Sequence, residues 1–244
     1  MPDDFDVSDE ERRKLMTDPA GRQNEAQRIR QIVARLARAQ PASRKVRRDP
    51  LDELILTILS QSTSDANCYR GWEALRAKYP DWEAALAAPP GEVEETIRPA
   101  GLSKQKSDTI LGVLSRLRNE QGSPTLDQIQ TLDDSEAVEY LTGFKGVGVK
   151  TAACVLCFAL GRDVIPVDTH VHRIALRLGL VPENASAVRT HEILNEIVPP
   201  ELRYELHVLL IGHGRSVCTA RKPRCGECDL ADCCPKVGIH TGGR

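Results

Sequence analysis

Four cysteines near the C-terminal end of the 244-residue chain have the spacing of ligands to one metal centre. They are Cys218, Cys225, Cys228 and Cys234, in the pattern C-x6-C-x2-C-x5-C, with Cys233 set aside. Four thiolates this close in sequence bind a tetrahedral zinc ion or an iron–sulfur cluster. Structural zinc usually takes its ligands as two short pairs, whereas only Cys225 and Cys228 form one here. The pattern favours a cubane iron–sulfur cluster over zinc, and either metal over ordinary structural cysteines.

The loop between the first two of these cysteines is basic. It contains Arg221, Lys222 and Arg224. Cations projecting from a loop that a metal centre holds rigid are suited to contacting a phosphate backbone. Spacing alone leaves a solvated basic turn as the alternative.

A second candidate site is the glycine-rich stretch Gly143–Ala152, which ends one predicted helix and begins another. Glycines allow a tight turn, and the amides of Gly146, Val147 and Gly148 at the new helix start form a cradle for phosphate. Lys150 lies at the mouth of this cradle. An amine whose pKa is lowered by its surroundings can attack a sugar carbon. A hairpin that only packs helices, with a surface lysine beside it, is the simpler alternative.

Eighteen residues after Lys150 comes Asp168, in the stretch Pro166-Val-Asp-Thr-His170. Aspartate before a helix is a typical N-cap. A carboxylate here can also activate an amine or stabilise an oxocarbenium-like sugar. The two roles are compatible in one residue.

Composition and charge restrict the class of protein. Hydrophobic residues make up 41% of the chain, enough for a core, and no apolar run reaches membrane-spanning length. The acidic N-terminus has no secretory signal, so eight cysteines indicate a reducing cytoplasm. The net charge is −2, but residues 28–48 hold eight bases and no acid. This segregation predicts either a basic, nucleic-acid-binding face or a solvated arginine-rich helix.

Apolar residues at helical spacing recur along the chain, and no convincing period-2 strand is present. The sequence therefore predicts an all-α fold. Helices are expected from residue 24 to 39, from Pro50 through Leu59, and from a cap at Asp65 to about Lys78. Further helices are expected over 92–98, after a hydroxyl cap at Ser103, over 126–131 and 135–141, to Leu160, over 168–178, 188–197 and 201–212.

The combination of motifs resembles endonuclease III, of the helix–hairpin–helix DNA glycosylase superfamily. The matching stretches are GVGVKTA at 146–152, VDTH at 167–170, HGRSVCTARKPRCGEC at 213–228 and the four-cysteine spacing. Similarity runs from about residue 28 to Cys234. The resemblance implies a six-helix barrel with the hairpin, a second lobe with a [4Fe–4S] loop, and a DNA groove between them. The expected parts are an acidic flexible tail (1–20), an N-terminal helix (21–44), the barrel (45–162) and the iron–sulfur domain (163–244).

The resemblance also implies residue roles. Lys150 matches the family's Schiff-base nucleophile and Asp168 its essential carboxylate, while the four cysteines match the cluster ligands. Gln61 and Leu102 match the side chains that fill the gap left by a flipped-out nucleotide, with Ser62 as a competitor for Gln61. Lys145 and Val149 depart from the proline and arginine usual at their positions.

The function expected is that of a bifunctional DNA glycosylase and AP lyase excising oxidised pyrimidines from double-stranded DNA. The partner is duplex DNA with a damaged base or an abasic site, and the protein is expected to be a cytoplasmic monomer without membrane contact. A monofunctional glycosylase using Asp168 and water is one alternative. A non-catalytic iron–sulfur DNA-binding protein is another.

Overall fold

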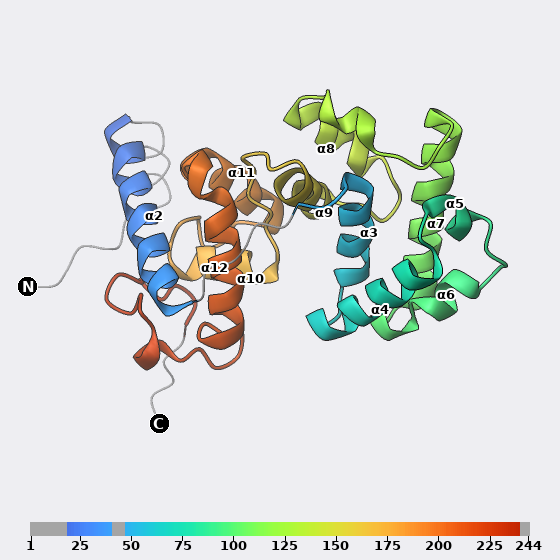
Figure 1. Cartoon of the computed structure of the whole chain (residues 1–244). Coiled ribbons are helices and arrows are strands. Elements are labelled where there is room, and N and C mark those ends of the chain that lie inside the picture. Colours follow the sequence, from blue (N-terminus) through green and yellow to red (C-terminus); the bar gives the residue numbers. More distant parts are fainter. Residues whose placement is uncertain (1–18, 41–46, 240–244) are drawn as a thin grey trace, which may run out of the picture. The chain divides into compact units, whose positions relative to one another are not determined.

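The structure is a computed structural model that describes residues 19–40 and 47–239. The chain folds into two compact units. We call residues 45–162 the hairpin unit, and residues 1–44 together with 163–244 the terminal unit, because the latter contains both ends of the chain. Every regular element in the described ranges is helical, which confirms the predicted all-α class (Figure 1).

The hairpin unit is built around α3 (Pro50–Ser60). Its N-cap is Asp49, whose carboxylate accepts hydrogen bonds from the amides of Leu51 and Asp52, and Pro50 occupies the first helical position as predicted. α3 is buried on nearly every side, and it packs against α4, α7 and α9. The other elements of the unit are α4 (Asp65–Lys78), α5 (Trp82–Leu86), α6 (Glu92–Thr96), a 3₁₀ turn (Arg98–Ala100), α7 (Ser103–Gln121), a 3₁₀ turn (Asp127–Gln130), α8 (Asp134–Thr142), α9 (Val149–Cys154) and a π-helical segment (Val155–Ala159).

Two predicted helix caps in this unit are wrong. Ser64, not Asp65, caps α4, because the Ser64 hydroxyl accepts the amide hydrogen of Asn67 and Asp65 is already helical. Ser103 does not cap α7: the residue before the helix is Leu102, and no side chain bonds the helix start. Ser62 and Leu102 adopt left-handed backbone angles, with φ of 51° and 48°. These angles are unfavourable for residues with a Cβ, so surrounding structure must hold both turns.

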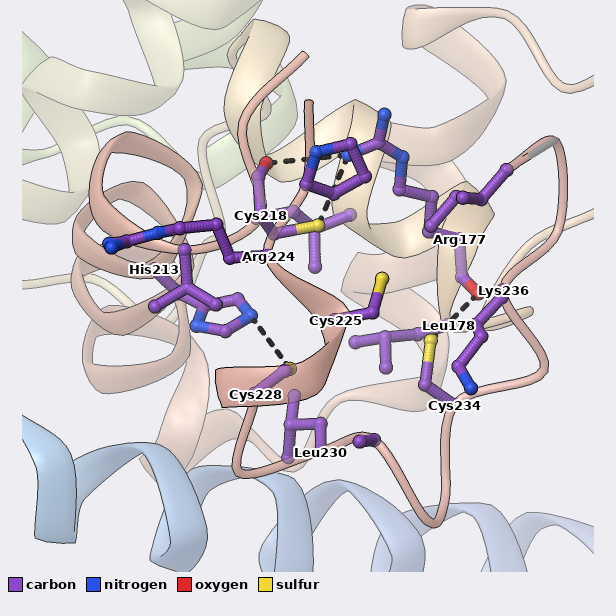
Figure 2. A pocket seen from close by; sticks show the side chains of 15 residues that line it. Arg177, Leu178, His213, Cys218, Arg224, Cys225, Cys228, Leu230, Cys234 and Lys236 are labelled. Atoms are coloured by element: carbon purple, nitrogen blue, oxygen red, sulfur yellow. Dashed lines mark hydrogen bonds between the residues drawn. The ribbon is translucent and has the colours of Figure 1, made fainter. Parts of the chain in front are cut away.

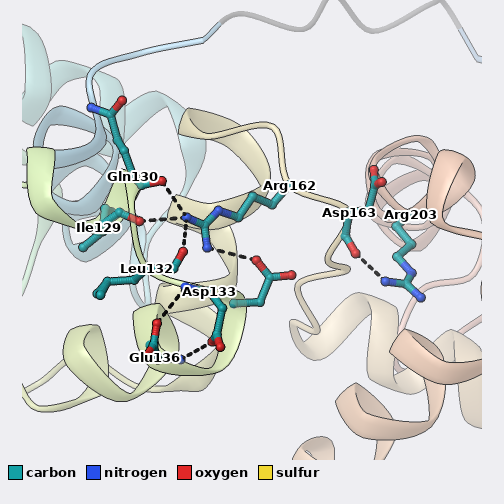
Figure 3. Close-up of polar contacts among 9 residues, drawn as sticks. Ile129, Gln130, Leu132, Asp133, Glu136, Arg162, Asp163 and Arg203 are labelled. Atoms are coloured by element: carbon teal, nitrogen blue, oxygen red, sulfur yellow. Dashed lines mark hydrogen bonds and ion pairs between the residues drawn. The ribbon is translucent and has the colours of Figure 1, made fainter.

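Arg162 closes the end of the hairpin unit (Figure 3). Its guanidinium donates to the carbonyls of Ile129 at 2.7 Å and Leu132 at 2.8 Å, and it pairs with Asp134 at 3.0 Å. α8 then begins with a capping box between Asp133 and Glu136. The loop before α8 is thereby tied to the segment that follows the π-helical turn.

The terminal unit consists of helices from both ends of the chain around one apolar core. Figure 1 shows α2 beside α12, and the two are in contact. The core combines Ile29, Ile32, Val33 and Leu36 of α2, which follow the predicted helical spacing, with apolar residues of the later helices. The helices of this unit are α2 (Pro19–Ala39), α10 (Thr169–Arg177), α11 (Ala187–Ile197) and α12 (Arg203–Ser216), with 3₁₀ turns at Pro200–Leu202 and Cys225–Glu227.

α2 begins at Pro19, five residues before its predicted start and inside the segment predicted as a tail. Residues 1–18 of that tail, and residues 41–46 after α2, lie outside the described residues. Three arginines of α2 have acidic partners within their own unit: Arg28 pairs with Glu25, Arg30 with Glu201 and Arg35 with Asp232. The pairs of Arg30 and Arg35 link α2 to later segments of the terminal unit, whereas the Arg28–Glu25 pair lies within α2. These three cations therefore do not form an unpaired basic face.

A membrane-spanning helix is not found in the described part of the chain, since none of its helices is both long and apolar enough.

Candidate functional site

Lys150 is the second residue of α9, directly after the glycine turn, and its side chain is half-buried. The turn needs glycine at 146, where φ is +85° and a Cβ would come within 2.8 Å of the Thr109 hydroxyl oxygen. Gly146 and Gly148 are exposed, so a ligand can approach the backbone here. Val147 differs: its side chain is buried and its amide donates to the Phe144 carbonyl at 3.1 Å. Val147 therefore closes the turn from inside.

The glutamine turn lies against this hairpin. Gln61 donates from Nε2 to the Gly146 carbonyl at 3.4 Å and is half-buried, whereas Ser62 is exposed at the tip. The amide of Gln61 is therefore engaged by the hairpin itself, while Ser62 projects from the surface. Leu102 is 55% exposed, one of three large apolar side chains with such exposure in the described ranges. The left-handed backbone of Leu102 is unfavourable for a residue with a Cβ, and such strained positions are often found at ligand-binding sites.

Glu53 is a residue near this site that sequence reasoning missed. It is 5% exposed, on α3, and its carboxylate contacts Arg48 at 3.3 Å and the Thr57 hydroxyl at 3.5 Å. Burial raises the pKa of Glu53, and the cations of Arg48 and, less strongly, Lys150 oppose the rise. Glu53 thus lies within electrostatic reach of the candidate nucleophile. Its signal in the sequence was an acid inside an otherwise apolar helix.

Asp168 is in the terminal unit, where it is the N-cap of α10 as predicted. Its Oδ1 accepts the amide hydrogens of His170 at 2.9 Å and Val171 at 2.8 Å. These two bonds fix the orientation of the carboxylate, and the side chain remains partly exposed. A carboxylate held in this way keeps acceptor capacity for a further group. Lys150 and Asp168 belong to different units, so their juxtaposition stays a prediction.

The four predicted ligand cysteines line a single pocket of the terminal unit (Figure 2). The rest of the lining is mainly apolar, with Ile174, Leu178 and Leu230 among the residues. Cys233 is not part of this lining, and its thiol donates to the Leu230 carbonyl at 3.5 Å. Cysteine sulfur in an apolar enclosure is the donor set of an iron–sulfur site, so the residues fit such a group.

The thiols surround this space and do not meet at one point. Within residues 19–40 and 47–239, no three His, Cys, Asp or Glu side chains are grouped as for a metal ion. No disulfide joins any of the eight cysteines, all of which lie in the described ranges. Burial raises the pKa of Cys228 and of Cys234. Binding of a metal group by these thiols requires release of the protons.

Two arginines of α10 anchor the start of the cysteine loop. Arg177 is 9% exposed and donates to the Cys218 sulfur at 3.2 Å, the Thr219 carbonyl at 2.8 Å and the Ala220 carbonyl at 2.9 Å. Arg173 donates to the Cys218 carbonyl at 2.9 Å. His213 of α12 lies on the other side, with Nε2 3.5 Å from the Cys228 sulfur, and burial lowers the pKa of His213 (Figure 2). These contacts depend on how α10 and α12 pack, so they were not predictable from local sequence patterns.

The basic loop residues have different surroundings. Lys222 is exposed. Arg224 is also exposed, but it pairs with Glu227 at 3.1 Å and donates to the Ser216 carbonyl. Part of the Arg224 charge is therefore compensated within the loop, and Lys222 is the better placed of the two for a phosphate.

Comparison with known proteins identifies the superfamily. The family model described as "HhH-GPD superfamily base excision DNA repair protein" matches residues 55–200. This range includes the hairpin, Lys150 and Asp168, and it ends before the four cysteines. The chain is 39% identical over 195 residues to an Arabidopsis thaliana protein named as a candidate DNA glycosylase, covering 78% of this chain and 66% of that protein. It is 34% identical over 189 residues to endonuclease III of Synechocystis, covering 77% of this chain and 82% of that enzyme.

Among solved structures, a trapped endonuclease III–DNA covalent intermediate matches with a TM-score of 0.74 and 31% identity. The match covers 86% of this chain and 96% of that one. Sequence and fold thus agree over most of the chain. The protein belongs to the HhH-GPD superfamily of base excision DNA repair proteins and is related to its endonuclease III members.

Proposed function

We propose that this protein is a bifunctional DNA N-glycosylase and AP lyase that acts on oxidised pyrimidines and abasic sites in double-stranded DNA. The observation that carries the proposal is Lys150, an amine at the mouth of an exposed glycine hairpin in a base excision repair family. The trapped covalent intermediate of the related endonuclease III supports a covalent route. We also propose that the protein acts in the cytoplasm as a monomer.

In the proposed reaction, Nζ of Lys150 attacks C1′ of the extruded nucleotide and the bond from C1′ to the base breaks, so the base leaves with that electron pair. The nitrogen then loses a proton, the C1′–O4′ bond breaks and O4′ takes up a proton, which gives an imine between Lys150 and C1′, while the departing base is protonated by solvent. The imine acidifies the C2′ proton. Removal of that proton forms a C2′–C3′ double bond, the C3′–O bond breaks, and the 3′ phosphate leaves. The strand is cut without hydrolysis of a phosphodiester.

Asp168 has the role of a fixed carboxylate in this proposal. The amides of His170 and Val171 hold its Oδ1, which leaves Oδ2 for the sugar or for the amine. A negative charge beside C1′ stabilises the oxocarbenium-like character that develops as the base leaves. The proposal requires Lys150 and Asp168 to face the same nucleotide.

The [4Fe–4S] cluster of the proposal would be held by Cys218, Cys225, Cys228 and Cys234, which line one largely apolar pocket. When bound, such a cluster supplies a redox-capable cross-link that fixes the fold of the loop. The chain's own part is to present Lys222, and to a lesser degree Arg224, to the DNA backbone. The exposed backbone at Gly146 and Gly148 would contact a second group of phosphates of the DNA.

The gap left by the flipped nucleotide would be filled from the hairpin unit. Leu102 is exposed and directed outward by its left-handed turn. On the other side, Gln61 is bonded to the hairpin and Ser62 is exposed, so we assign Ser62 to the tip and Gln61 to support of the hairpin.

Borohydride trapping on a duplex with an abasic site tests the proposal. The wild-type protein is expected to give a covalent adduct, and Lys150→Gln none, with strand cleavage lower by at least about 10³-fold. Lys145→Gln, which removes an exposed lysine of the same turn, is the matched control and should still be trapped. Excision of the base without an adduct or strand cleavage would instead indicate a monofunctional glycosylase that uses Asp168 and water. Duplex binding without excision of any lesion would indicate a non-catalytic binding protein.

A further inference from the structure

The hairpin unit contains a buried lysine that the proposed chemistry does not use. Lys106, on α7, is 2% exposed. Its Nζ donates to the Leu59 carbonyl at 2.7 Å and to the Ala100 carbonyl at 2.8 Å. Burial lowers the pKa of Lys106. A long cationic side chain is rarely enclosed to this degree, so its two acceptors explain why it is tolerated.

Both acceptors lie at the ends of helical segments. Leu59 is in the last turn of α3, and Ala100 ends the 3₁₀ turn Arg98–Ala100. Carbonyls at a helix end lack partners within the helix, and a cation there is electrostatically favourable. Lys106 therefore supplies a hydrogen-bond donor and a positive charge to the ends of two helical segments. An apolar side chain of the same length would fill the space but leave both carbonyls without this donor.

The two helix ends lead directly into the two turns assigned to DNA insertion. Ser60, Gln61 and Ser62 follow Leu59, and Gly101 and Leu102 follow Ala100. Ser62 and Leu102 are two of the three non-glycine residues with positive φ in the described part of the chain. Ala100 is also fixed from another side, because a Cβ on Gly71 of α4 would come within 2.9 Å of its Cβ. The ammonium group of Lys106 therefore connects the starts of two exposed turns, each of which contains a residue with an unfavourable backbone angle.

We propose that Lys106 is a positioning residue that sets the separation of Leu102 and the Gln61–Ser62 turn, so that both enter the gap beside an extruded nucleotide. The inference rests on the proposed function and adds to it a residue that touches neither DNA nor the reacting atoms. Because insertion must match the spacing of a single vacated base, a shift of about 1 Å is enough to lower the rate strongly.

The test replaces Lys106 by methionine, which keeps the length and removes both donors. Arg118→Met is the matched control, since it removes an exposed cation from the same helix. The readouts are the single-turnover excision rate and the fluorescence of 2-aminopurine placed opposite a non-cleavable abasic analogue. For Lys106→Met we expect a rate about 10- to 100-fold lower and a reduced fluorescence change, with affinity for undamaged duplex within about twofold. For Arg118→Met we expect wild-type values.

A double-mutant cycle separates positioning from a general loss of stability. Leu102→Ala lowers the rate in the wild-type background, and we expect a much smaller additional loss in the Lys106→Met background, because the leucine is already misplaced. Effects that simply multiply, or unchanged fluorescence in Lys106→Met, would overturn the proposal. If Lys106→Met does not fold, Lys106→Gln takes its place, since its amide can keep one of the two bonds, with an expected loss of about threefold.

The wild-type protein distinguishes failure of this inference from failure of the proposed function. If it neither excises damaged bases nor forms an adduct, the proposed function fails and Lys106 loses its role with it. If it does both and Lys106→Met behaves as wild type, only the positioning role is wrong.

Discussion

The hairpin unit and the loop that carries the four cysteines hold their functional residues in opposite ways. In the hairpin unit, Lys150 begins a helix packed against α3, and the neighbouring turns are tied down by Gln61 and Lys106. In the cysteine loop, residues 217–239 contain one short 3₁₀ turn. The loop is held by arginine contacts from α10, by partly buried thiols and by the Arg224–Glu227 pair.

This difference indicates where each region is sensitive. Helices that bury apolar faces keep their geometry when one exposed side chain changes. A loop with little regular secondary structure depends more on its individual polar contacts and on whatever its thiols bind. We therefore expect a substitution of a functional residue in the hairpin unit to lower activity without unfolding the unit. A substitution in the cysteine loop should instead disorder the loop itself.

The largest effect is expected for Cys225→Ser, which removes one of the four proposed ligands. The proposed cluster should be lost, with absorbance near 400 nm (an approximate value) falling to background. The terminal unit should be destabilised by on the order of 3 kcal/mol, because ligand binding contributes to folding. Absorption spectra and thermal unfolding followed by circular dichroism measure both. Cys233→Ser, outside the pocket, should leave the spectrum intact; an equal loss there would contradict the ligand assignment.

A pair of substitutions at Asp168 divides its structural role from its proposed catalytic one. Asparagine is as good an N-cap as aspartate, so Asp168→Asn should keep the stability within about 0.5 kcal/mol while excision falls by about 10²- to 10⁴-fold. Asp168→Ala should lose the same activity and also about 0.5–2 kcal/mol of stability. Denaturant unfolding and single-turnover kinetics give the two quantities. Full activity in the asparagine variant would restrict Asp168 to capping.

The proposed docking role of the loop cations predicts a salt-dependent effect. Replacing Lys222 with alanine should lower the magnitude of the slope of log K against log[salt] by about 0.9, the value for one phosphate contact on B-DNA. Arg224→Ala should change it less, because Glu227 already pairs with the guanidinium. Fluorescence anisotropy with a duplex over a range of salt concentrations measures the slopes. Equal slopes for the wild type and for a variant that combines Lys222→Ala with Arg224→Ala would refute docking through this loop.

The smallest effect concerns Glu53, whose pKa burial raises. The folded state binds its proton more tightly than the unfolded chain, so this group favours folding fully below the unfolded pKa, near 4.3, and loses that contribution as pH rises through the folded pKa. Glu53→Gln should thus raise the melting temperature at pH 7 by about 2–4 °C, with the difference shrinking toward pH 4. Glu95→Gln, at an exposed ion pair of the same unit, should show no such pH dependence.

Several features were predictable because they are local. The helical spacing of Ile29, Ile32, Val33 and Leu36 predicted α2, and Pro50 predicted the start of α3. The misplaced caps at Asp65 and Ser103 show the limit of such reasoning. Ser64 and Asp65 are both good caps, so neighbouring residues compete, and α7 begins after a left-handed leucine for which local preference gives no reason.

Lys106 and Glu53 mark what sequence patterns do not reveal. Lys106 lies one turn before Ile110 on the apolar stripe of α7, and a charged residue at such a position was the available signal. Its acceptors, however, are 47 and 6 residues away in sequence. Arg177 likewise reaches the sulfur of Cys218 across 41 residues. Such arrangements depend on helix packing, and no short window of sequence contains Lys106 with both of its acceptors, or Arg177 with Cys218.

The order of residues alone determined the helical class, the spacing of the four cysteines, and the positions of Lys150 and Asp168 along the chain, because these depend on periodicity and residue type. Only the tertiary structure decided that four of the five C-terminal cysteines line one pocket, that three arginines of α2 pair with acids, and that a buried ammonium joins two exposed turns. The physical reason is that burial and ion pairing are properties of neighbours in space, and the chain brings these neighbours together only when its helices pack.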